Sequence, residues 1–206
     1  MTRVLLKVVI ISLLLLGGCQ KSNLSLLENS CSEVGCIHPL DVLKSINLSR
    51  LNYVKQLDQK GCGAAAISSL LEYWDKSASY ESIVLKYPSA STKGYAVGEL
   101  KYIASEYGLA AYSLQMSEKS LRKNLSMGRP IIIAVKKYIF DYINVLPNFL
   151  PFKEYITYSH YLVVFGYNDE GYWVMDPAKG YYFVTNKALK EMWSRQKFVS
   201  LLISSK

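Results

Sequence analysis

The amino-acid sequence predicts an α+β fold in which amino-terminal helices pack on a carboxyl-terminal antiparallel sheet. After an irregular amino-terminal stretch, apolar residues recur at the three- and four-residue spacing of helices. The carboxyl-terminal half instead holds short runs of β-branched and aromatic residues separated by turn residues. Helices first and an antiparallel sheet second are typical of the α+β class.

The helical patterns begin close to Cys62. From there an apolar stripe at helical spacing predicts a buried helix. A second helical pattern covers residues 97–107 and ends at Gly108, as helices often end at glycine. A third, amphipathic helix is expected over residues 117–125. The apolar members of the first stripe are Ala64, Ile67, Leu70, Leu71 and Trp74.

Strand patterns fill the rest of the predicted domain. The β-branched run that follows Pro130 is typical of a buried strand. Residues 168–171, Asn-Asp-Glu-Gly, form a turn between two later strands, and a short helix is expected over residues 187–193. The expected strands cover residues 110–114, 131–135, 161–167, 171–175, 181–185 and 197–203.

Residues 138–158 fit neither a helical nor a strand period. They carry many aromatic side chains together with Pro147 and Pro151. Ordinary core packing is one interpretation of these aromatics. The other is a loop or lid beside a functional site, because long irregular segments inside compact domains are often functional. The apolar content of such a loop would suit a peptide or a membrane surface.

The first 18 residues have the order of a secretory signal peptide. Arg3 and Lys7 come first, and an unbroken apolar run over residues 8–16 follows them. This run is too short for a permanent anchor, because a bilayer-spanning helix needs about 20 apolar residues. We therefore expect residues 1–18 to be cleaved off, and we exclude them from the predicted fold.

The sequence Leu-Gly-Gly-Cys at residues 16–19 resembles a bacterial lipoprotein box, in which the signal is cut before a cysteine that becomes lipidated. The resemblance implies lipidation of Cys19. A Ser- and Asn-rich tether would then cover residues 19–50 and lead into a domain over residues 51–206. The protein would be lipid-anchored in the bacterial cell envelope, facing the periplasm or the exterior. A structural thiol, plain secretory cleavage and a double-glycine export leader are the alternatives.

The remaining cysteines are Cys31, Cys36 and Cys62. Exported proteins meet an oxidising environment, so the close pair Cys31 and Cys36 predicts a small disulfide. Two free surface thiols, or a metal site that includes His38, are the alternatives, although this spacing matches no standard zinc pattern. Cys62 is left unpaired, and an unpaired thiol in an oxidising compartment requires a reason.

The composition excludes several function classes. The formal net charge is +8 at pH 7, but the lysines are scattered among acidic residues, so no basic stripe marks a nucleic-acid surface. No second apolar run approaches membrane-spanning length, and no Gly-x-x-x-x-Gly-Lys loop for nucleotide phosphates is present. The sequence therefore predicts neither nucleic-acid binding nor ATP binding, and no cofactor is expected.

Cys62 stands where a polar loop turns abruptly into the first buried helix. A cysteine at a helix N-terminus feels the positive end of the helix dipole and unpaired backbone N–H groups, both of which favour the thiolate. Gly61 and Gly63 flank it and would let a substrate backbone approach closely. A small buried cysteine that packs under the helix start is the alternative.

His160 and Asp176 are the candidate partners of this thiol. The chain has two histidines, and His38 lies in the predicted tether. His160 stands at the entrance of a predicted strand, and Asp176 ends the next one, so antiparallel pairing of the two strands would bring both side chains together. The alternative is a histidine in the core and an Asp-Pro that merely ends a strand.

Together these motifs resemble those of the C39 family, papain-like cysteine peptidases that trim double-glycine leaders from bacteriocins. In that family a glutamine precedes a Cys-Gly that opens a helix, a histidine begins a strand in a His-Tyr-x-Val-Val context, and an Asp-Pro follows. The resemblance spans residues 54–203 and implies a papain-like cysteine peptidase fold. The matching segments are Gln56, Cys62-Gly63, His160-Tyr161-Leu162-Val163-Val164 and Asp176-Pro177.

The resemblance also implies a role for each residue. Cys62 would attack a peptide carbonyl as the thiolate, His160 would carry the proton, and Asp176 would orient the imidazole. Gln56 would donate to the oxyanion, with Gln59 as the rival donor. The implied partners are a peptide or protein substrate and components of an export system. The implied function is cleavage of a secreted or exported protein after a Gly-containing leader.

The sequence departs from the family pattern in two places. Gly61 stands where the family usually has an acidic residue, and the gap before His160 is longer by about the aromatic segment. Most relatives are also the amino-terminal part of an export ATPase, whereas this chain is similar to standalone members. An acyl-transferring enzyme would use the same residues, and a non-catalytic lipoprotein that binds an export substrate is a further alternative.

Overall fold

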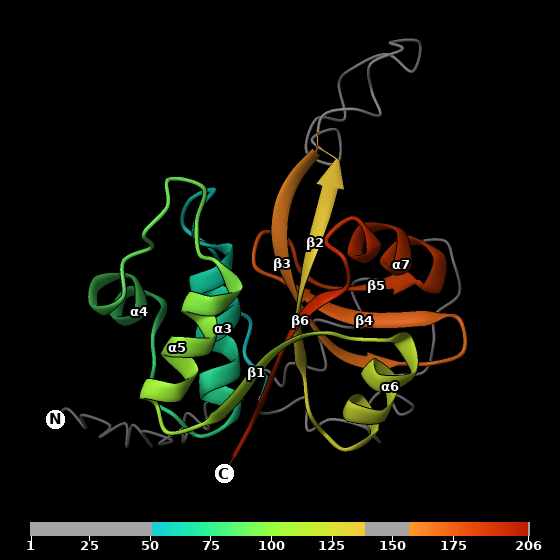
Figure 1. The fold of residues 1–206 in the computed structure, drawn as a ribbon, viewed down its shortest axis with the longest axis horizontal. Coiled ribbons are helices and arrows are strands. Elements are labelled where there is room, and N and C mark those ends of the chain that lie inside the picture. The colour runs from blue at the N-terminus through green and yellow to red at the C-terminus, as the bar shows by residue number, and fades with distance from the viewer. Residues whose placement is uncertain (1–50, 139–156, 206) are drawn as a thin grey trace, which may run out of the picture.

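The structure, a computed structural model, describes residues 51–138 and 157–205. Within these ranges a group of helices lies beside an antiparallel sheet that carries two further helices (Figure 1). The α+β class predicted from the sequence is confirmed. The elements are α3 (Cys62–Tyr73), α4 (Tyr80–Lys86), α5 (Val97–Glu106), β1 (Ala110–Gln115), α6 (Glu118–Ser126), β2 (Ile131–Tyr138), β3 (Thr157–Tyr167), β4 (Gly171–Asp176), β5 (Gly180–Thr185), α7 (Asn186–Ser194) and β6 (Val199–Ser204).

α3 is the central helix of the amino-terminal group. Its sequence is rich in alanine, the best helix former, and nearly all of its residues are buried. A helix that is apolar on most sides needs neighbours around it, and α3 contacts α4, α5 and β3. The helix ends at Tyr73 with Trp74 as its C-cap, after which Asp75 adopts a positive φ of 58°. The helix predicted to begin near Cys62 is therefore confirmed.

The sequence pattern does not predict α4. This helix is seven residues long and buries Tyr80 and Ile83, so its apolar period is too short to stand out. Its local signal is a cap, because the Ser79 side chain accepts a hydrogen bond from the backbone N–H of Ser82 at 3.1 Å. α4 nevertheless matters for the site, since it places Tyr80 beside the start of α3.

α5 ends close to the predicted boundary. Gly108 follows it with a positive φ of 77°, which glycine adopts without strain. At the other end, the Glu99 carboxylate accepts a hydrogen bond from the backbone N–H of Ala96. α5 packs on β1 and β6, and so fixes the helical group to one side of the sheet.

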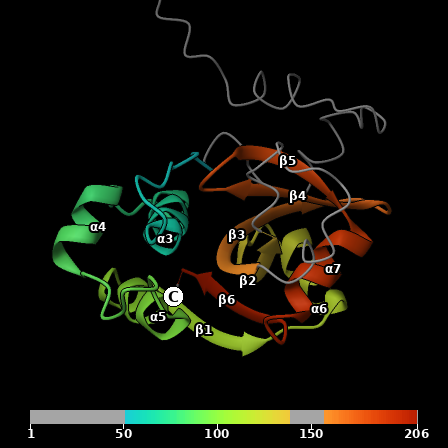
Figure 2. The same cartoon turned by 90° about the horizontal axis from the view of Figure 1, so that it is seen from above.

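The sheet is antiparallel, with strand order β1-β6-β2-β3-β4-β5. α3 packs against β3, whereas α6 and α7 pack on the other side against β2, β3, β4 and β5 (Figure 2). β1 precedes α6 in the chain and pairs with β6, so the sheet is not built from the carboxyl-terminal half alone. All residues of β4 and most residues of β2 and β3 are buried, so these inner strands supply much of the core.

β2 and β3 form a longer ladder than the sequence predicts. β2 continues to Tyr138, and β3 begins at Thr157. The added residues are mostly polar or aromatic, so they show no clear strand period. They pair in register nevertheless, with Val135 opposite His160. His160 therefore lies inside a strand and not at its entrance.

The connection between β3 and β4 is a tight turn, as predicted. Gly171 closes this turn and is the first residue of β4, where the expected strand also begins. The Asn168 side chain accepts a hydrogen bond from the Gly171 backbone N–H at 2.9 Å, which fixes the turn. The ladder shifts its register between Val164 and Gly166, which marks a β-bulge. β4 then ends at Asp176, across from the inner part of β3.

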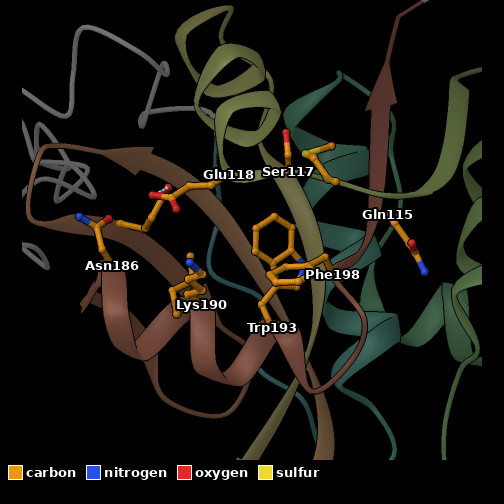
Figure 3. Close-up of a pocket in the computed structure, with 10 residues that line it drawn as sticks. Gln115, Ser117, Glu118, Asn186, Lys190, Trp193 and Phe198 are labelled. Atoms are coloured by element: carbon orange, nitrogen blue, oxygen red, sulfur yellow. Dashed lines mark hydrogen bonds between the residues drawn. The ribbon is translucent and has the colours of Figure 1, made fainter.

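A cavity of about 400 Å³ lies on the α6 and α7 side of the sheet (Figure 3). Trp193 and Phe198 form part of its wall, and Glu118 and Lys190 also line it. None of its lining residues belongs to the catalytic set predicted from the sequence. Among the described residues, no helix combines the length and the apolarity that crossing a membrane requires.

Candidate active site

Cys62 is the first residue of α3 and is 7% exposed. The first turn of α3 contains no acidic residue, so nothing in it opposes the positive end of the helix dipole. The first backbone N–H groups of a helix have no partner within the helix, which leaves the Cys62 N–H as an available donor. The expected position of Cys62 at a helix N-terminus is confirmed.

The two glycines beside Cys62 serve packing. A Cβ at Gly61 would overlap the Tyr80 hydroxyl, and a Cβ at Gly63 would lie 2.8 Å from the Tyr95 Cβ. Both glycines therefore let a tyrosine pack directly on the start of α3. This corrects the interpretation that they leave room for a substrate backbone. It also gives a reason for the missing acidic residue at Gly61, because Tyr80 occupies that space.

Tyr161 and Tyr95 join β3 to the start of α3. The Tyr161 hydroxyl donates a hydrogen bond to the Tyr95 backbone carbonyl at 3.1 Å, and the Tyr95 side chain packs on Gly63. Burial raises the pKa of Tyr161 above its ordinary value, so its hydroxyl stays a donor. The strand that carries His160 is thereby held against the helix that carries Cys62.

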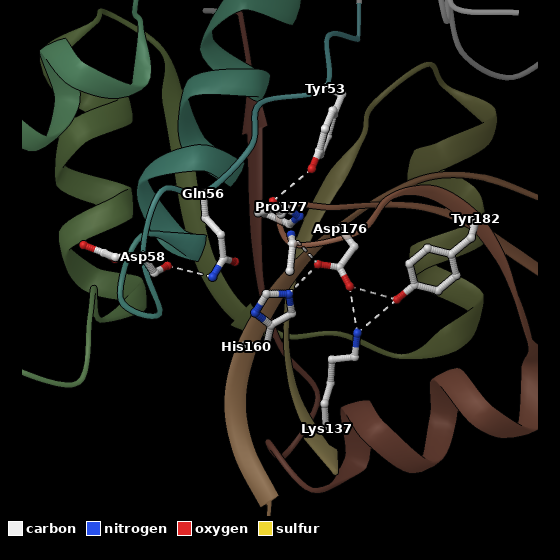
Figure 4. Close-up of polar contacts among 9 residues, drawn as sticks. Tyr53, Gln56, Asp58, Lys137, His160, Asp176, Pro177 and Tyr182 are labelled. Carbon is white, nitrogen blue, oxygen red and sulfur yellow. Dashed lines mark hydrogen bonds and ion pairs between the residues drawn. The ribbon is translucent and has the colours of Figure 1, made fainter. Parts of the chain in front are cut away.

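His160 on β3 and Asp176 at the end of β4 lie side by side (Figure 4). The distance between His160 Nε2 and Asp176 Oδ1 is 2.7 Å. His160 is 3% exposed and Asp176 is fully buried, so water competes little for this contact. Antiparallel pairing of β3 with β4 produces the juxtaposition that the sequence predicts.

The contact with Asp176 determines which ring nitrogen faces Cys62. Because the carboxylate occupies Nε2, Nδ1 is the nitrogen left for the thiol. Desolvation by burial lowers the pKa of His160, but hydrogen bonds and negative charges from Asp176 and Cys62 outweigh it and raise this pKa above 6.5. The surroundings of His160 therefore favour the protonated imidazolium more than water does.

Asp176 is surrounded by donors. Its Oδ2 accepts hydrogen bonds from the Lys137 ammonium at 2.7 Å and from the Tyr182 hydroxyl at 3.0 Å (Figure 4). Its Oδ1 also accepts the Ala178 backbone N–H at 2.8 Å. Burial alone would raise the pKa of Asp176, but the hydrogen bonds and charges of His160 and Lys137 hold it well below its usual range. The carboxylate is therefore ionised in the folded protein.

Sequence reasoning missed Lys137 and Tyr182. Lys137 is 2% exposed and continues the inward-facing series Ile131, Ile133, Val135 of β2. A lysine at an inward strand position requires a buried acid nearby. The alternation of side chains along the strand could therefore have indicated that Lys137 has a buried acidic partner. That signal appears only when the strand is extended past Val135. Tyr182 has no comparable signal, because its position depends on how β5 pairs with β4.

Gln56 lies in the loop before α3 and is tied to the end of β4. Its backbone N–H donates to the Pro177 carbonyl at 2.9 Å, and its side-chain Nε2 donates to the Asp58 carbonyl at 2.7 Å (Figure 4). The amide nitrogen carries two hydrogens, so the second can bind an oxyanion. Gln59, the rival donor, is exposed to solvent.

Several expected features lie outside the described residues. These are Cys19, Cys31 and Cys36, so lipidation and the disulfide stay predictions, as does the role of the aromatic segment, of which residues 139–156 are not described. Within the described ranges Cys62 is a free cysteine. In the same ranges, no group of three or more His, Cys, Asp or Glu side chains could hold a metal ion.

The fold resembles solved peptidase domains. A protein described as a C39-like peptidase from Bacillus anthracis matches with a TM-score of 0.60 and 16% identity, over 76% of this chain and 95% of that one. The peptidase domain of Streptococcus ComA, a bifunctional ABC transporter, matches with a TM-score of 0.56 and 16% identity, over 75% of this chain and 100% of that one. A double-glycine motif protease from an AMS/PCAT transporter, in complex with the leader peptide, matches with a TM-score of 0.55 and 18% identity, over 75% of this chain and 91% of that one. These likenesses confirm the predicted papain-like cysteine peptidase fold.

The family of the chain follows from its sequence. Comparison with curated proteins gives no match. The pattern of the Peptidase_C39 like family, however, matches residues 49–201, which is most of the chain. This range includes Gln56, Cys62, His160 and Asp176. The chain therefore belongs to the Peptidase_C39 like family.

Proposed function

We propose that this protein is an exported, membrane-anchored cysteine peptidase that cleaves a secreted or exported protein after a Gly-containing leader. One observation carries the proposal: Cys62 begins α3 and acts electrostatically on His160, whose Nε2 lies 2.7 Å from Asp176 Oδ1. A thiol at a helix N-terminus beside an ion-paired imidazole is an activated nucleophile. Membership of the Peptidase_C39 like family supports the same chemistry.

In the proposed mechanism, the Cys62 thiolate attacks the carbonyl carbon of the scissile peptide bond, and a C–S bond forms. The carbonyl oxygen becomes an oxyanion, which the Cys62 backbone N–H and the Gln56 amide bind. The imidazolium of His160 gives its Nδ1 proton to the leaving nitrogen as the C–N bond breaks. The amine product departs, and an acyl thioester remains on Cys62.

Water completes the cycle. Neutral His160 takes a proton from a water molecule, whose oxygen attacks the thioester carbonyl and forms a second oxyanion in the same place. Collapse of this intermediate breaks the C–S bond and releases the carboxyl product. The enzyme returns to its thiolate–imidazolium form. Asp176 stays ionised throughout and accepts the Nε2 proton as a hydrogen bond, which keeps Nδ1 directed at Cys62.

A glycine at the cleavage site fits the limited access to the nucleophile. Cys62 is 7% exposed, so a substrate must bring its backbone close to the start of α3. Residues without a side chain allow the closest approach of a backbone. One structural neighbour is a double-glycine motif protease in complex with the leader peptide. That protein shares the fold at 18% identity, so it supports the class of substrate and not a particular sequence.

Peptide cleavage by the purified full chain tests the proposal. Matched synthetic peptides with a central Gly-Gly, Gly-Ala or Ala-Ala are incubated with the protein, with and without hydroxylamine, and the products are identified by mass spectrometry. Hydrolysis at glycine supports the peptidase. Transfer of the acyl group to hydroxylamine with little hydrolysis would favour an acyl-transferring enzyme. Binding of the peptides with no turnover would favour the non-catalytic lipoprotein.

Gln56→Ala should lower the turnover of a cleaved peptide by about 100- to 1,000-fold, the usual effect of removing one oxyanion donor. The matched control is Gln59→Ala, the same change in the same loop at a solvent-exposed position. It should leave turnover nearly unchanged. The backbone hydrogen bond from Gln56 to Pro177 survives the substitution, so the loop should keep its position. Equal losses in both variants would contradict the assignment of Gln56.

Cys19→Ala should release the protein from membranes if Cys19 carries the lipid. A single acyl chain binds a membrane only marginally and two bind stably, so loss of a diacylated residue has a large effect. The measurement is the distribution of the protein between membrane and soluble fractions. Cys31→Ala, which removes a cysteine from the predicted tether, serves as the control and should stay membrane-bound. Full recovery of Cys19→Ala with membranes would count against the anchor.

A further inference from the structure

Lys137 and Asp176 form an ion pair in the interior. Their Nζ and Oδ2 atoms are 2.7 Å apart, and the two residues are 2% and 0% exposed. Removal of two charges from water is costly, and apolar residues of similar size would often stabilise a fold as well or better. Stability alone therefore gives no reason for this pair. Its location gives one, because Asp176 is also the carboxylate that holds His160.

The carboxylate of Asp176 is held by contacts with neighbouring strands and with the turn that follows β4. Oδ1 faces His160 on β3 and the Ala178 backbone N–H in the turn after β4. Oδ2 faces Lys137 on β2 and Tyr182 on β5. The Lys137 ammonium also donates to the Tyr182 hydroxyl at 3.3 Å and lies over its ring at 5.7 Å from the centroid. The carboxylate is therefore held so that it cannot turn away from His160.

We propose that Lys137, supported by Tyr182, is a positioning residue of the active site that aims Oδ1 of Asp176 at His160 and neutralises the buried carboxylate. The inference rests on the proposed function, because it concerns the same thiol–imidazole pair. With Lys137 present, the thiolate, imidazolium, carboxylate and ammonium sum to zero charge. Without it, the buried site carries one uncompensated negative charge.

Neutralisation by Lys137 has a consequence for His160. A nearby cation disfavours the protonated imidazole, and Lys137 lies on the other oxygen of the carboxylate that binds the ring. Lys137→Met keeps the length of the side chain and removes the charge. It should therefore raise the pKa of His160 by about one unit, the size expected for a unit charge a few ångströms away in a partly shielded site.

The titration can be read directly by NMR of the imidazole protons, because the chain has two histidines and His38 serves as an internal reference. The matched control is Lys136→Met, which removes the same charge from the neighbouring residue of β2, whose side chain points to the opposite face of the sheet. It should leave the pKa of His160 almost unchanged. Lys137→Arg retains the charge and should restore most of the wild-type titration.

A double-variant cycle shows whether Lys137 acts through Asp176. Asp176→Asn alone leaves a buried ammonium without its carboxylate, whereas Asp176→Asn with Lys137→Met leaves no buried charge of this pair. The double variant should therefore melt at a higher temperature than Asp176→Asn. In the same background, Lys137→Met should shift the pKa of His160 far less than it does in the wild type. The comparison of the two melting temperatures remains decisive even if Lys137→Met alone does not fold.

Two results would overturn the proposal. One is a folded Lys137→Met protein in which His160 titrates as in the wild type. The other is a double variant that is less stable than Asp176→Asn, because Lys137 would then act independently of the carboxylate. Failure of the proposed peptidase function looks different: the wild type would cleave no peptide, yet His160 would still respond to Lys137.

Discussion

Cys62→Ala should abolish peptide cleavage and leave the fold intact. The thiol is the nucleophile of the proposed mechanism, and removal of a catalytic nucleophile in a comparable serine enzyme lowers turnover by about 10⁶-fold. The variant should therefore cleave at or below the detection limit. The helix should tolerate the change, because α3 has no side-chain cap and alanine is the best helix former.

Thermal unfolding separates loss of chemistry from loss of structure. Cys62 is buried but small, so its replacement by alanine should cost little stability. Each kcal/mol of unfolding free energy lost lowers the melting temperature of a domain of this size by about 2–4 °C. Cys31→Ala, at a cysteine outside the proposed site, should retain full activity. Cleavage by Cys62→Ala at the wild-type rate would refute the peptidase mechanism. Alkylation of Cys62 by iodoacetamide without loss of cleavage would refute it equally.

The sequence was sufficient for the elements that show a clear apolar pattern, either a helical stripe or an apolar run. α3 and α5 are recognisable because their stripes run over several turns, and Gly108 marks the end of α5. The β2 to β5 strands are recognisable because they are apolar and bounded by turn residues. α4 is not recognisable, since a seven-residue helix with two buried side chains leaves too short a pattern.

The limits of β2 and β3 depend on pairing between strands and not on local composition. Lys136 and Ser159 would each favour solvent in isolation, yet they sit opposite one another in the ladder. The strands persist because their neighbours supply the hydrogen bonds, which no single segment of sequence records. The same extension brings Lys137 inside the protein, so the boundary error and the missed residue have one cause.

The candidate site was predictable where its chemistry requires particular residue types. A Cys at a helix start, one histidine outside the predicted tether and an Asp at the end of the next strand define Cys62, His160 and Asp176. The supporting tyrosines were not predictable, because the side chains of Tyr80 and Tyr95 fill the space above Gly61 and Gly63. Such packing depends on how α4 and the loop before α5 fold back on α3.

Asp176→Asn should cause the second largest loss of activity. Removal of the negative charge is one reason, and the orientation that Lys137 imposes on the new amide is another. An asparagine has one acceptor end and one donor end, whereas Asp176 accepts on both oxygens. The ammonium of Lys137 should attract the amide oxygen. The amide nitrogen would then face His160 and require an unprotonated Nε2, which places the ring proton on Nδ1.

A proton on Nδ1 of the neutral ring prevents it from taking the proton of Cys62 or of water. The corresponding change in a serine triad lowers turnover by about 10⁴-fold through this wrong tautomer, and we expect a loss of about 10³- to 10⁴-fold here. The variant should also lose about 3–5 kcal/mol of unfolding free energy, because a buried ion pair is broken on one side. Turnover and denaturant unfolding measure the two effects separately.

Asp169→Asn is the matched control, because it makes the same change at a solvent-exposed position in the turn between β3 and β4. It should alter neither turnover nor stability by a measurable amount. The tautomer of His160 in Asp176→Asn can be read from its ring ¹⁵N shifts, which should show the proton on Nδ1. If the proton is still on Nε2 and turnover falls less than about tenfold, Asp176 is not what directs the imidazole. Because Lys137 drives the amide into the unfavourable orientation, adding Lys137→Met to Asp176→Asn should return part of the lost activity together with the lost stability.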